Sequence, residues 1–176
     1  MIKCNLAVLL AERNMKISEL SKRTGISRTT LTALAQNQSK GIQFDTFDTL
    51  CNYLKITPND LFIQERFEYD FSVTQISEEE IEISASTINV IVQAEIVYKN
   101  NHFEKQFPCE VTLYQNGIDI EKISIAPRYP DEIFDVLISI PVTFKTSFEE
   151  ELAECIKSEI IVKYNLEYED IETHVW

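Results

Sequence analysis

Hydrophobic residues in the first third of the chain recur at steps of three and four. Steps of this size put side chains on one face of an α-helix. The groups that follow this period are Leu6, Leu9 and Leu10; Ile17 and Leu20; Leu31 and Leu34; and Phe44, Phe47, Leu50, Cys51 and Leu54. The pattern therefore predicts a series of short amphipathic helices, each with one face directed into a shared core.

Gly25 separates two of these helices. Glycine readily takes the left-handed backbone conformation that ends a helix sharply, and Ser27 is a favourable N-cap for the helix that follows. This spacing predicts the tight turn of a helix-turn-helix. An ordinary two-helix corner in a bundle is the alternative, because the motif by itself is short.

The helix after the turn has an outward face with a distinctive composition. With Leu31 and Leu34 directed inward, its solvent face carries Arg28, Thr29, Thr32 and Ala33. Arginine can donate to guanine in the major groove, and the methyl groups of Thr and Ala can contact thymine. These four residues are the candidate base-contacting residues.

Two further helix starts follow. Asp45 is the expected N-cap of the helix that runs to Leu54, and Thr57 is the expected cap of a short helix that begins at Pro58. Five short helices of this length and order resemble the Cro/repressor (Xre-type) family of DNA-binding domains. The resemblance covers roughly residues 1–66, and its matching segments include Asp45 to Cys51 and Pro58 to Phe62. It implies a sequence-specific regulator of transcription that binds double-stranded DNA, and we expect it to act as a homodimer.

The resemblance also implies which residues meet the DNA backbone. Ser27 and Thr30 are placed to contact phosphates, and the loop after the recognition helix is expected to run along the backbone. That loop consists of Gln36, Asn37, Gln38, Ser39 and Lys40. Relatives usually carry Thr-Gln at the start of the preceding helix, where this chain has Lys16-Ile17. Lys16 can replace that phosphate contact by charge, whereas the side chain of Ile17 cannot donate a hydrogen bond.

From Phe67 onward the period changes from helical to alternating, which is typical of half-buried strands. The segments with this alternation are 67–73, 88–98, 107–113 and 134–144. Asn116-Gly117 is expected to form a two-residue hairpin turn, with a return strand through Ile118 and Ile120. We expect a mainly antiparallel sheet of five or six strands.

A long helix is expected near the C-terminus. Ser147 and Glu150 have the spacing of a capping box. The apolar stripe behind it consists of Phe148, Leu152, Cys155, Ile156, Ile160 and Tyr164. This stripe is expected to pack on the sheet of its own domain, with pairing to a second copy as the alternative. The predicted fold class is α+β: a five-helix helix-turn-helix domain over residues 1–66, then a mainly antiparallel β-sheet domain with one long C-terminal helix over residues 67–176.

Charge is divided unevenly between these two parts. Residues 1–66 contain nine Lys and Arg against six Asp and Glu, whereas residues 67–176 contain seven against twenty-three. The small positive excess attracts DNA only weakly, so tight binding requires correct local contacts from two copies. The acidic part is the expected dimerisation or sensing domain.

Sequence signals for catalysis or metal binding are lacking. Self-cleaving repressors need a scissile bond before glycine, but beyond residue 66 the only glycine is Gly117, preceded by Asn116. His102 and His174 have no metal-ligand spacing, and the four cysteines are expected to be buried free thiols. We therefore expect no enzyme activity, no catalytic residue, no metal and no cofactor.

Four functions remain as hypotheses. The leading one is a repressor that does not cleave itself, acting as a dimer in the cytoplasm, since no segment is apolar enough to cross a membrane. The second is a protein-binding module, such as an antitoxin, whose acidic C-terminal domain binds a basic partner. The third is a regulator gated by a small-molecule effector, and an enzyme comes last.

Overall fold

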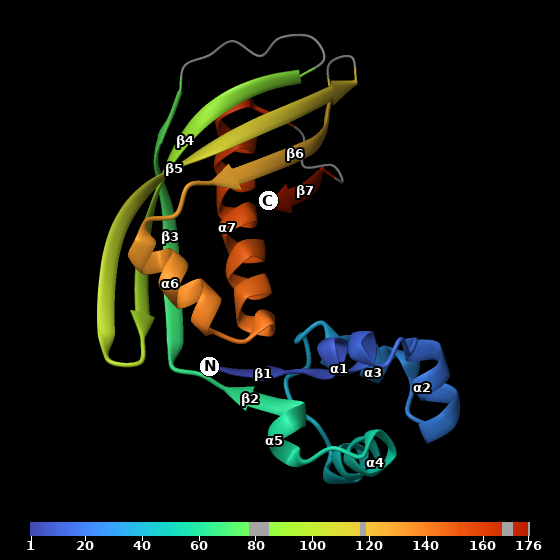
Figure 1. Cartoon of the computed structure of the whole chain (residues 1–176). Coiled ribbons are helices and arrows are strands. Elements are labelled where there is room, and N and C mark those ends of the chain that lie inside the picture. Colours follow the sequence, from blue (N-terminus) through green and yellow to red (C-terminus); the bar gives the residue numbers. More distant parts are fainter. Residues whose placement is uncertain (78–84, 117–118, 167–170, 176) are drawn as a thin grey trace. The chain divides into compact units, whose positions relative to one another are not determined.

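The structure, a computed structural model, describes residues 1–77, 85–116, 119–166 and 171–175 (Figure 1). The chain divides into two units, Met1–Glu65 and Arg66–Trp176. We refer to them as the N-terminal unit and the C-terminal unit. Helical periods dominate the first and strand periods the second, so the change of period at Phe67 falls next to the boundary.

The N-terminal unit consists of short helices closed by a two-stranded sheet. Its helices are α1 (Leu6–Glu12), α2 (Ile17–Thr24), α3 (Arg28–Ala35), α4 (Phe44–Leu54) and α5 (Pro58–Leu61). Strands β1 (Ile2–Cys4) and β2 (Phe62–Gln64) pair antiparallel and hold the two ends of the unit together. The sequence analysis missed both strands, because three residues are too few to show an alternating period.

The apolar residues of these helices form one core. Its buried members are Cys4, Leu6, Leu9, Leu10, Leu20, Leu31, Leu34, Leu50, Leu54 and Leu61. Two expectations for α4 are wrong. Gln43 occupies the N-cap position, so Asp45 lies in the first turn, and Phe44 is 89% exposed. As the first helical residue, Phe44 points away from the core that Leu50 and Leu54 enter.

The predicted cap of α5 is confirmed. The Asp60 carboxylate accepts hydrogen bonds from the backbone N–H and the hydroxyl of Thr57, both at 2.7 Å. These bonds hold the pKa of Asp60 below its usual value. Pro58 takes the first helical position, where its missing N–H costs nothing.

The C-terminal unit contains a five-stranded sheet. In spatial order its strands are β3 (Phe67–Ile76), β4 (Ala85–Tyr98), β5 (Asn101–Asn116), β6 (Asp119–Pro127) and β7 (Glu172–Val175). The first four form an antiparallel meander, as predicted, and β7 pairs parallel to β6. The predicted turn residue Gly117 and Ile118 lie outside the described residues, although Asn116 and Asp119 pair on either side of them.

The strand predicted over residues 134–144 is wrong. This segment instead contains α6 (Asp131–Ser139) and the start of α7 (Val142–Tyr164). Pro130 and Pro141 occupy the two N-cap positions, each with an extended ψ near 150°. Both prolines thus precede a helix. Pro141 separates α6 from α7 within the segment that the alternating pattern had predicted as one strand.

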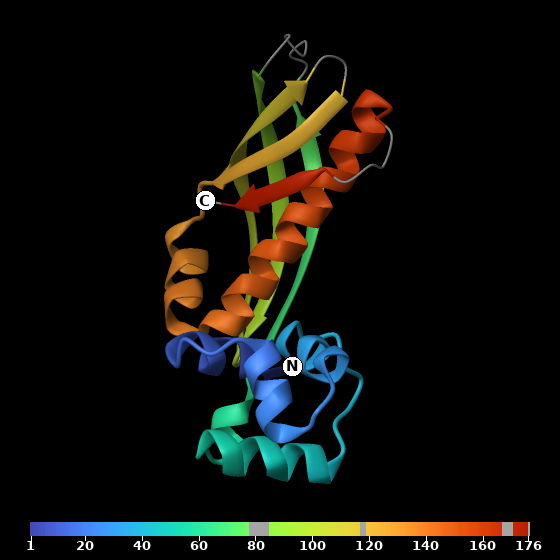
Figure 2. The ribbon, with the colours of Figure 1, turned by 90° about the vertical axis from the view of Figure 1, so that its right-hand side faces the viewer.

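The long helix α7 is present but begins five residues before the expected capping box. Ser147 lies inside the helix, where its hydroxyl donates to the Thr143 carbonyl oxygen at 3.1 Å. The predicted stripe does pack on the sheet of its own unit: Phe148, Leu152, Ile156 and Ile160 are fully buried. Because α7 contacts both edge strands, β3 and β7, the sheet curves around it (Figure 2).

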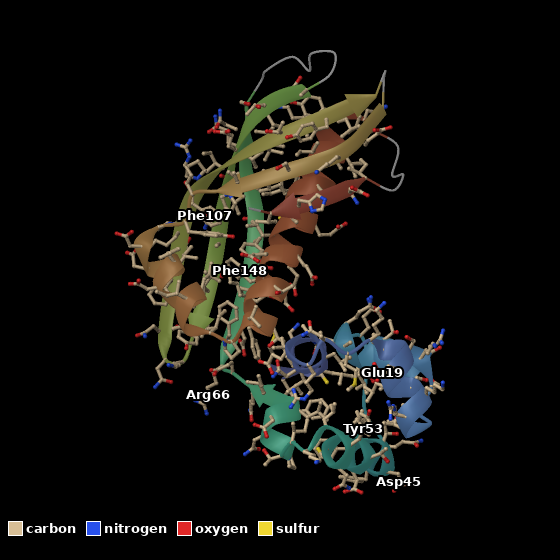
Figure 3. The ribbon with its side chains drawn as sticks, turned by 45° about the vertical axis from the view of Figure 1, so that its right-hand side comes forward. Glu19, Asp45, Tyr53, Arg66, Phe107 and Phe148 are labelled. Carbon is tan, nitrogen blue, oxygen red and sulfur yellow. The ribbon has the colours of Figure 1, made fainter. Side chains whose placement is uncertain are left out.

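Phe148 is the centre of an aromatic cluster between α7 and the sheet (Figure 3). Its ring centroid lies 4.8 Å from that of Phe71, 5.0 Å from that of Tyr69 and 5.8 Å from that of Phe67. Tyr129 extends the cluster to Phe107, with centroids 5.2 Å apart. The cluster joins β3, β5 and α7 into one core.

Candidate nucleic-acid interface

The turn between α2 and α3 has the predicted geometry. Gly25 takes the left-handed conformation, with φ of +78°, and its N–H donates to the Ser21 carbonyl oxygen at 2.9 Å. The Ser21 hydroxyl donates to the Ile26 carbonyl oxygen at 2.6 Å. The end of α2 and the approach to α3 are therefore fixed by local hydrogen bonds.

Gly25→Ala is expected to destabilise the N-terminal unit by about 1–2 kcal/mol, because a side chain makes the left-handed conformation costly. No atom lies within 4 Å of the position that a Cβ would occupy, so backbone strain is the only cause. Thermal unfolding followed by circular dichroism measures the loss. Gly41→Ala is the control, because Gly41 also has open space around it and has no positive φ. Equal losses in the two variants would contradict the strain argument.

Ser27 caps α3 as predicted. Its hydroxyl oxygen accepts from the Thr30 N–H at 3.1 Å and lies 2.8 Å from the Thr30 hydroxyl. Only one of the two hydroxyl protons can be used between this pair, so the other remains available to an acceptor outside the helix. Both predicted phosphate-contacting side chains of α3 are exposed and lie together at its N-terminus.

The structure brings the four candidate base-contacting residues onto one side of α3. Leu31 and Leu34 are buried on the opposite side. Arg28 and Thr29, in the first turn, are exposed, and Thr32 and Ala33 are half-buried. Within the described part of the chain, no carboxylate lies within ion-pair distance of Arg28. Its guanidinium group is available for two parallel hydrogen bonds.

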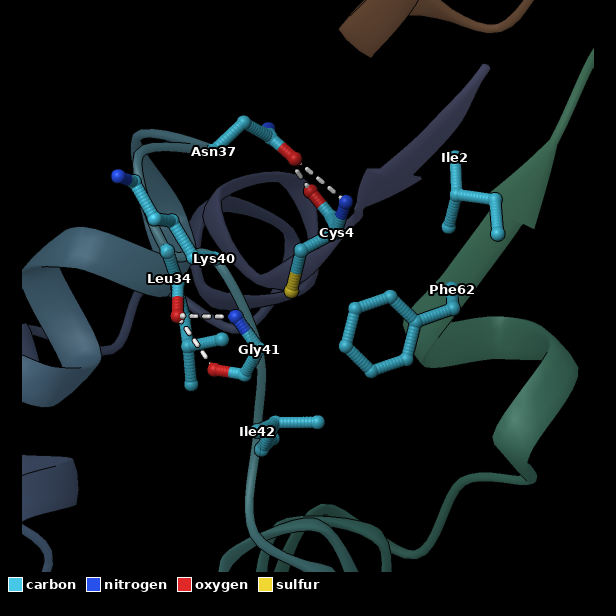
Figure 4. A pocket seen from close by; sticks show the side chains of 9 residues that line it. Ile2, Cys4, Leu34, Asn37, Lys40, Gly41, Ile42 and Phe62 are labelled. Carbon is cyan, nitrogen blue, oxygen red and sulfur yellow. Dashed lines mark hydrogen bonds between the residues drawn. The ribbon is translucent and has the colours of Figure 1, made fainter.

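The loop after α3 uses some of its predicted contact residues internally. Asn37 has a φ of +56°, and its amide bonds both to the N–H and to the carbonyl oxygen of Cys4 (Figure 4). The Ser39 hydroxyl donates to the Gly41 carbonyl oxygen at 2.6 Å. Gln36, Gln38 and Lys40 are exposed. Asn37 thus anchors the loop to β1, whereas the side chains of Gln36, Gln38 and Lys40 are directed outward.

A hollow of about 330 Å³ lies beside this loop (Figure 4). It is lined by Ile2, Cys4, Leu34, Asn37, Ser39, Lys40, Gly41, Ile42 and Phe62. None of the four candidate base-contacting residues is among them. The hollow is therefore separate from the outward face of α3.

The N-terminus of α2 is the other predicted phosphate contact. Lys16 occupies its N-cap position and is exposed, and no side chain caps the helix. An uncapped helix N-terminus presents backbone N–H groups with partial positive charge to an anion. The Lys16 ammonium group adds a full charge next to them, and Ile17 occupies the first helical position.

Positive charge is concentrated from the second half of α2 to the loop after α3. Between Glu19 and Asp45 the chain has no acidic residue, whereas it has four cations, Lys22, Arg23, Arg28 and Lys40. Arg23 is 3.7 Å from Glu19, one turn earlier on α2. The sequence analysis averaged charge over residues 1–66 and missed this local concentration, although it can be read directly from the sequence.

The described residues give little support for metal binding or for catalysis by a cysteine nucleophile. They contain no cluster of three or more His, Cys, Asp or Glu that could hold a metal ion. The four cysteines are free, but only Cys4 and Cys109 are buried as expected, whereas Cys51 and Cys155 are half-buried. Burial raises the pKa of Cys4 and of Cys109, the latter to about 12. Neither buried thiol is therefore activated as a nucleophile. No helix among the described residues is long and apolar enough to span a membrane.

Comparisons with known proteins agree with this geometry. The Cro/C1-type HTH DNA-binding domain matches residues 5–65. The uncharacterized HTH-type transcriptional regulator YozG of Bacillus subtilis (strain 168) is 37% identical over 57 residues, which are 32% of this chain and 68% of that protein. No solved structure matches the chain. By its N-terminal unit, the chain belongs to the Cro/C1-type helix-turn-helix family.

Proposed function

We propose that the protein is a sequence-specific transcriptional regulator, and that it represses by occupying its DNA site as a dimer. The observation that carries this proposal is the outward face of α3, where Arg28 lies exposed in a segment without carboxylates. The cations of this segment attract an anionic duplex, and an α-helix fits the major groove.

The contacts divide into two kinds. Arg28 and Thr29, with Thr32 and Ala33 one turn later, read base edges. Ser27, Thr30 and Lys16 position the domain on phosphates, because their hydroxyl and ammonium groups lie at the N-termini of α3 and α2. In the loop after α3, Gln36, Gln38 and Lys40 follow the DNA backbone. Asn37 and Ser39 shape the loop through their internal bonds.

The C-terminal unit serves to pair two copies or to sense a signal. Its sheet and α7 form a core of their own. Its acidity does not assist DNA binding, which leaves affinity to the local contacts of two N-terminal units.

Selection from random DNA by the full chain at low salt tests the function. We expect an enriched palindromic sequence with half-sites about one helical turn apart, ~34 Å between centres. Binding should weaken steeply as salt is added, because phosphate contacts release counterions. Recovery of unenriched DNA at every salt concentration would contradict sequence-specific regulation.

Lys40→Ala is expected to weaken binding to all sequences by a similar factor and to reduce the salt slope by ~1, as for a lost phosphate contact. Electrophoretic mobility shifts over a salt series, on selected and on scrambled DNA, measure both quantities. Lys55→Ala is the matched control, because it removes the same charge from the C-cap of α4. A larger loss on selected DNA alone would assign Lys40 to base reading.

A further inference from the structure

We infer that Asn37 is a positioning residue for DNA binding, which ties the loop after α3 to the free edge of β1. Through this tie it sets where the Lys40 ammonium group meets a phosphate, so β1 takes part in DNA binding without contacting DNA. The inference rests on the proposed function, since Lys40 is one of its phosphate contacts.

The free edge of β1 is where Asn37 binds. Met1 and Asn5, the residues that flank β1, bond to the residues that flank β2. Because backbone groups alternate in direction along a strand, the N–H and carbonyl oxygen of Cys4 point away from β2. The Asn37 Oδ1 accepts from the Cys4 N–H at 2.5 Å, and its Nδ2 donates to the Cys4 carbonyl oxygen at 3.2 Å. One side-chain amide therefore takes the place that a neighbouring strand would occupy.

The loop has few other attachments beyond Asn37. In the part of the chain that the structure describes, the hydrogen bonds of residues 39–41 stay within the loop. The next attachment is Ile42, which packs against the core of the N-terminal unit. Lys40 thus lies on a short span between Asn37 and Ile42, beside the hollow of about 330 Å³ (Figure 4). The hollow gives this span room to move once the amide tie is removed.

The backbone of Asn37 allows the tie to be removed alone. Its φ of +56° is a left-handed conformation, which glycine adopts without a steric cost. Asn37→Gly therefore keeps the turn at the end of α3 and deletes only the amide. Asn14→Gly is the matched control, because Asn14 has a φ of +50° and its side chain makes no hydrogen bond to any described residue. The two variants share the backbone effect and differ in the bonds to Cys4.

The first test needs no DNA. Backbone amide relaxation of the full chain, measured by NMR, gives order parameters, and a loop held by Asn37 should show about 0.85 at residues 39–41. Asn37→Gly is expected to lower these values below about 0.6 and to speed hydrogen exchange of the Cys4 N–H, whereas Asn14→Gly leaves both unchanged. A wild-type loop that is already mobile, or equal values in the three chains, overturns the inference.

The second test measures binding of the full chain to the selected DNA. Asn37→Gly is expected to weaken binding by roughly tenfold and to reduce the salt slope by up to ~1, because a freed Lys40 no longer holds its phosphate. A direct phosphate contact of the uncharged amide would leave the slope unchanged. An equal loss of binding in Asn14→Gly would show that the turns alone matter and would overturn the inference.

A double-mutant cycle with Lys40→Ala shows through which group Asn37 acts. In the Lys40→Ala background, Asn37→Gly is expected to cost less than roughly twofold, because the contact that it positions is already missing. Equal losses in both backgrounds assign Asn37 to a direct contact with DNA and remove this inference alone. A full chain that selects no DNA sequence, while its loop stays ordered through Asn37, removes the proposed function and reduces Asn37 to a structural tie.

Discussion

Phe148→Ala is expected to destabilise the C-terminal unit by about 3–5 kcal/mol, the usual range when a buried phenylalanine is truncated. The Phe148 side chain is fully buried, and its ring lies between α7 and the three aromatic residues of β3. Those rings are fixed to the sheet by their own strand and cannot collapse into the space that the substitution opens. The cost therefore includes an unfilled cavity as well as the lost transfer free energy.

Urea unfolding followed by far-ultraviolet circular dichroism measures this loss, and hydrogen exchange in β4 and β5 assigns it to the C-terminal unit. Phe134→Ala is the matched control, because Phe134 is 53% exposed on α6 of the same unit. Its effect should stay within about 0.5 kcal/mol. Similar losses in the two variants would show that the aromatic cluster is not the centre of this core.

The N-terminal unit could be predicted in most of its parts because its signals are local. Gly25, Ser27 and Thr57 act on backbone groups within a few residues, and the inward leucines repeat at the helical period. Phe44 shows the limit of that argument. It has the spacing of the α4 stripe, but it stands at the first helical position, beyond the end of the core.

The strand prediction for residues 134–144 was wrong because both an alternating and a helical period fit this stretch of the sequence. Alternate residues from Phe134 to Phe144 are all apolar, which indicates a strand. The buried residues instead include Ile133 and Leu137, which the alternation had directed to solvent, whereas Phe134 and Ile138 are exposed. The deciding signals were Pro130 with two acids directly after it, and Pro141, both of which favour helix starts.

Contacts between distant residues had no signal in the sequence. The bond of Asn37 to Cys4 joins residues 33 apart and gives an expected phosphate contact an internal role. Strand β7 pairs parallel to β6 although α6 and α7 lie between them in the chain. Its four residues are too few to show a period. The residues on the outward face of α3 could be predicted, because helix geometry alone determines which of them share a side.

Arg28→Ala is expected to weaken binding to the selected DNA by ~1–3 kcal/mol per half-site and to relax the preference at one base position. The guanidinium group lies at the start of α3, exposed and without an ion-pair partner among the described residues. It can therefore donate two parallel hydrogen bonds to a guanine edge, a geometry that no other side chain of α3 provides. Losing both bonds leaves the guanine acceptors unpaired in a desolvated groove, which raises the cost above that of a lost charge.

Arg23→Ala separates base reading from charge, because it removes the same positive charge from α2, where Arg23 lies 3.7 Å from Glu19. Competition binding with every single-base variant of the selected site measures both affinity and preference for the two proteins. We expect Arg23→Ala to weaken all sites slightly and to leave their ranking unchanged, whereas Arg28→Ala flattens the ranking at one position. If Arg28→Ala instead weakens every site by the same factor, Arg28 contacts phosphate. Sequence reading must then come from Thr29, Thr32 and Ala33, whose methyl groups distinguish thymine from the other bases but cannot select guanine.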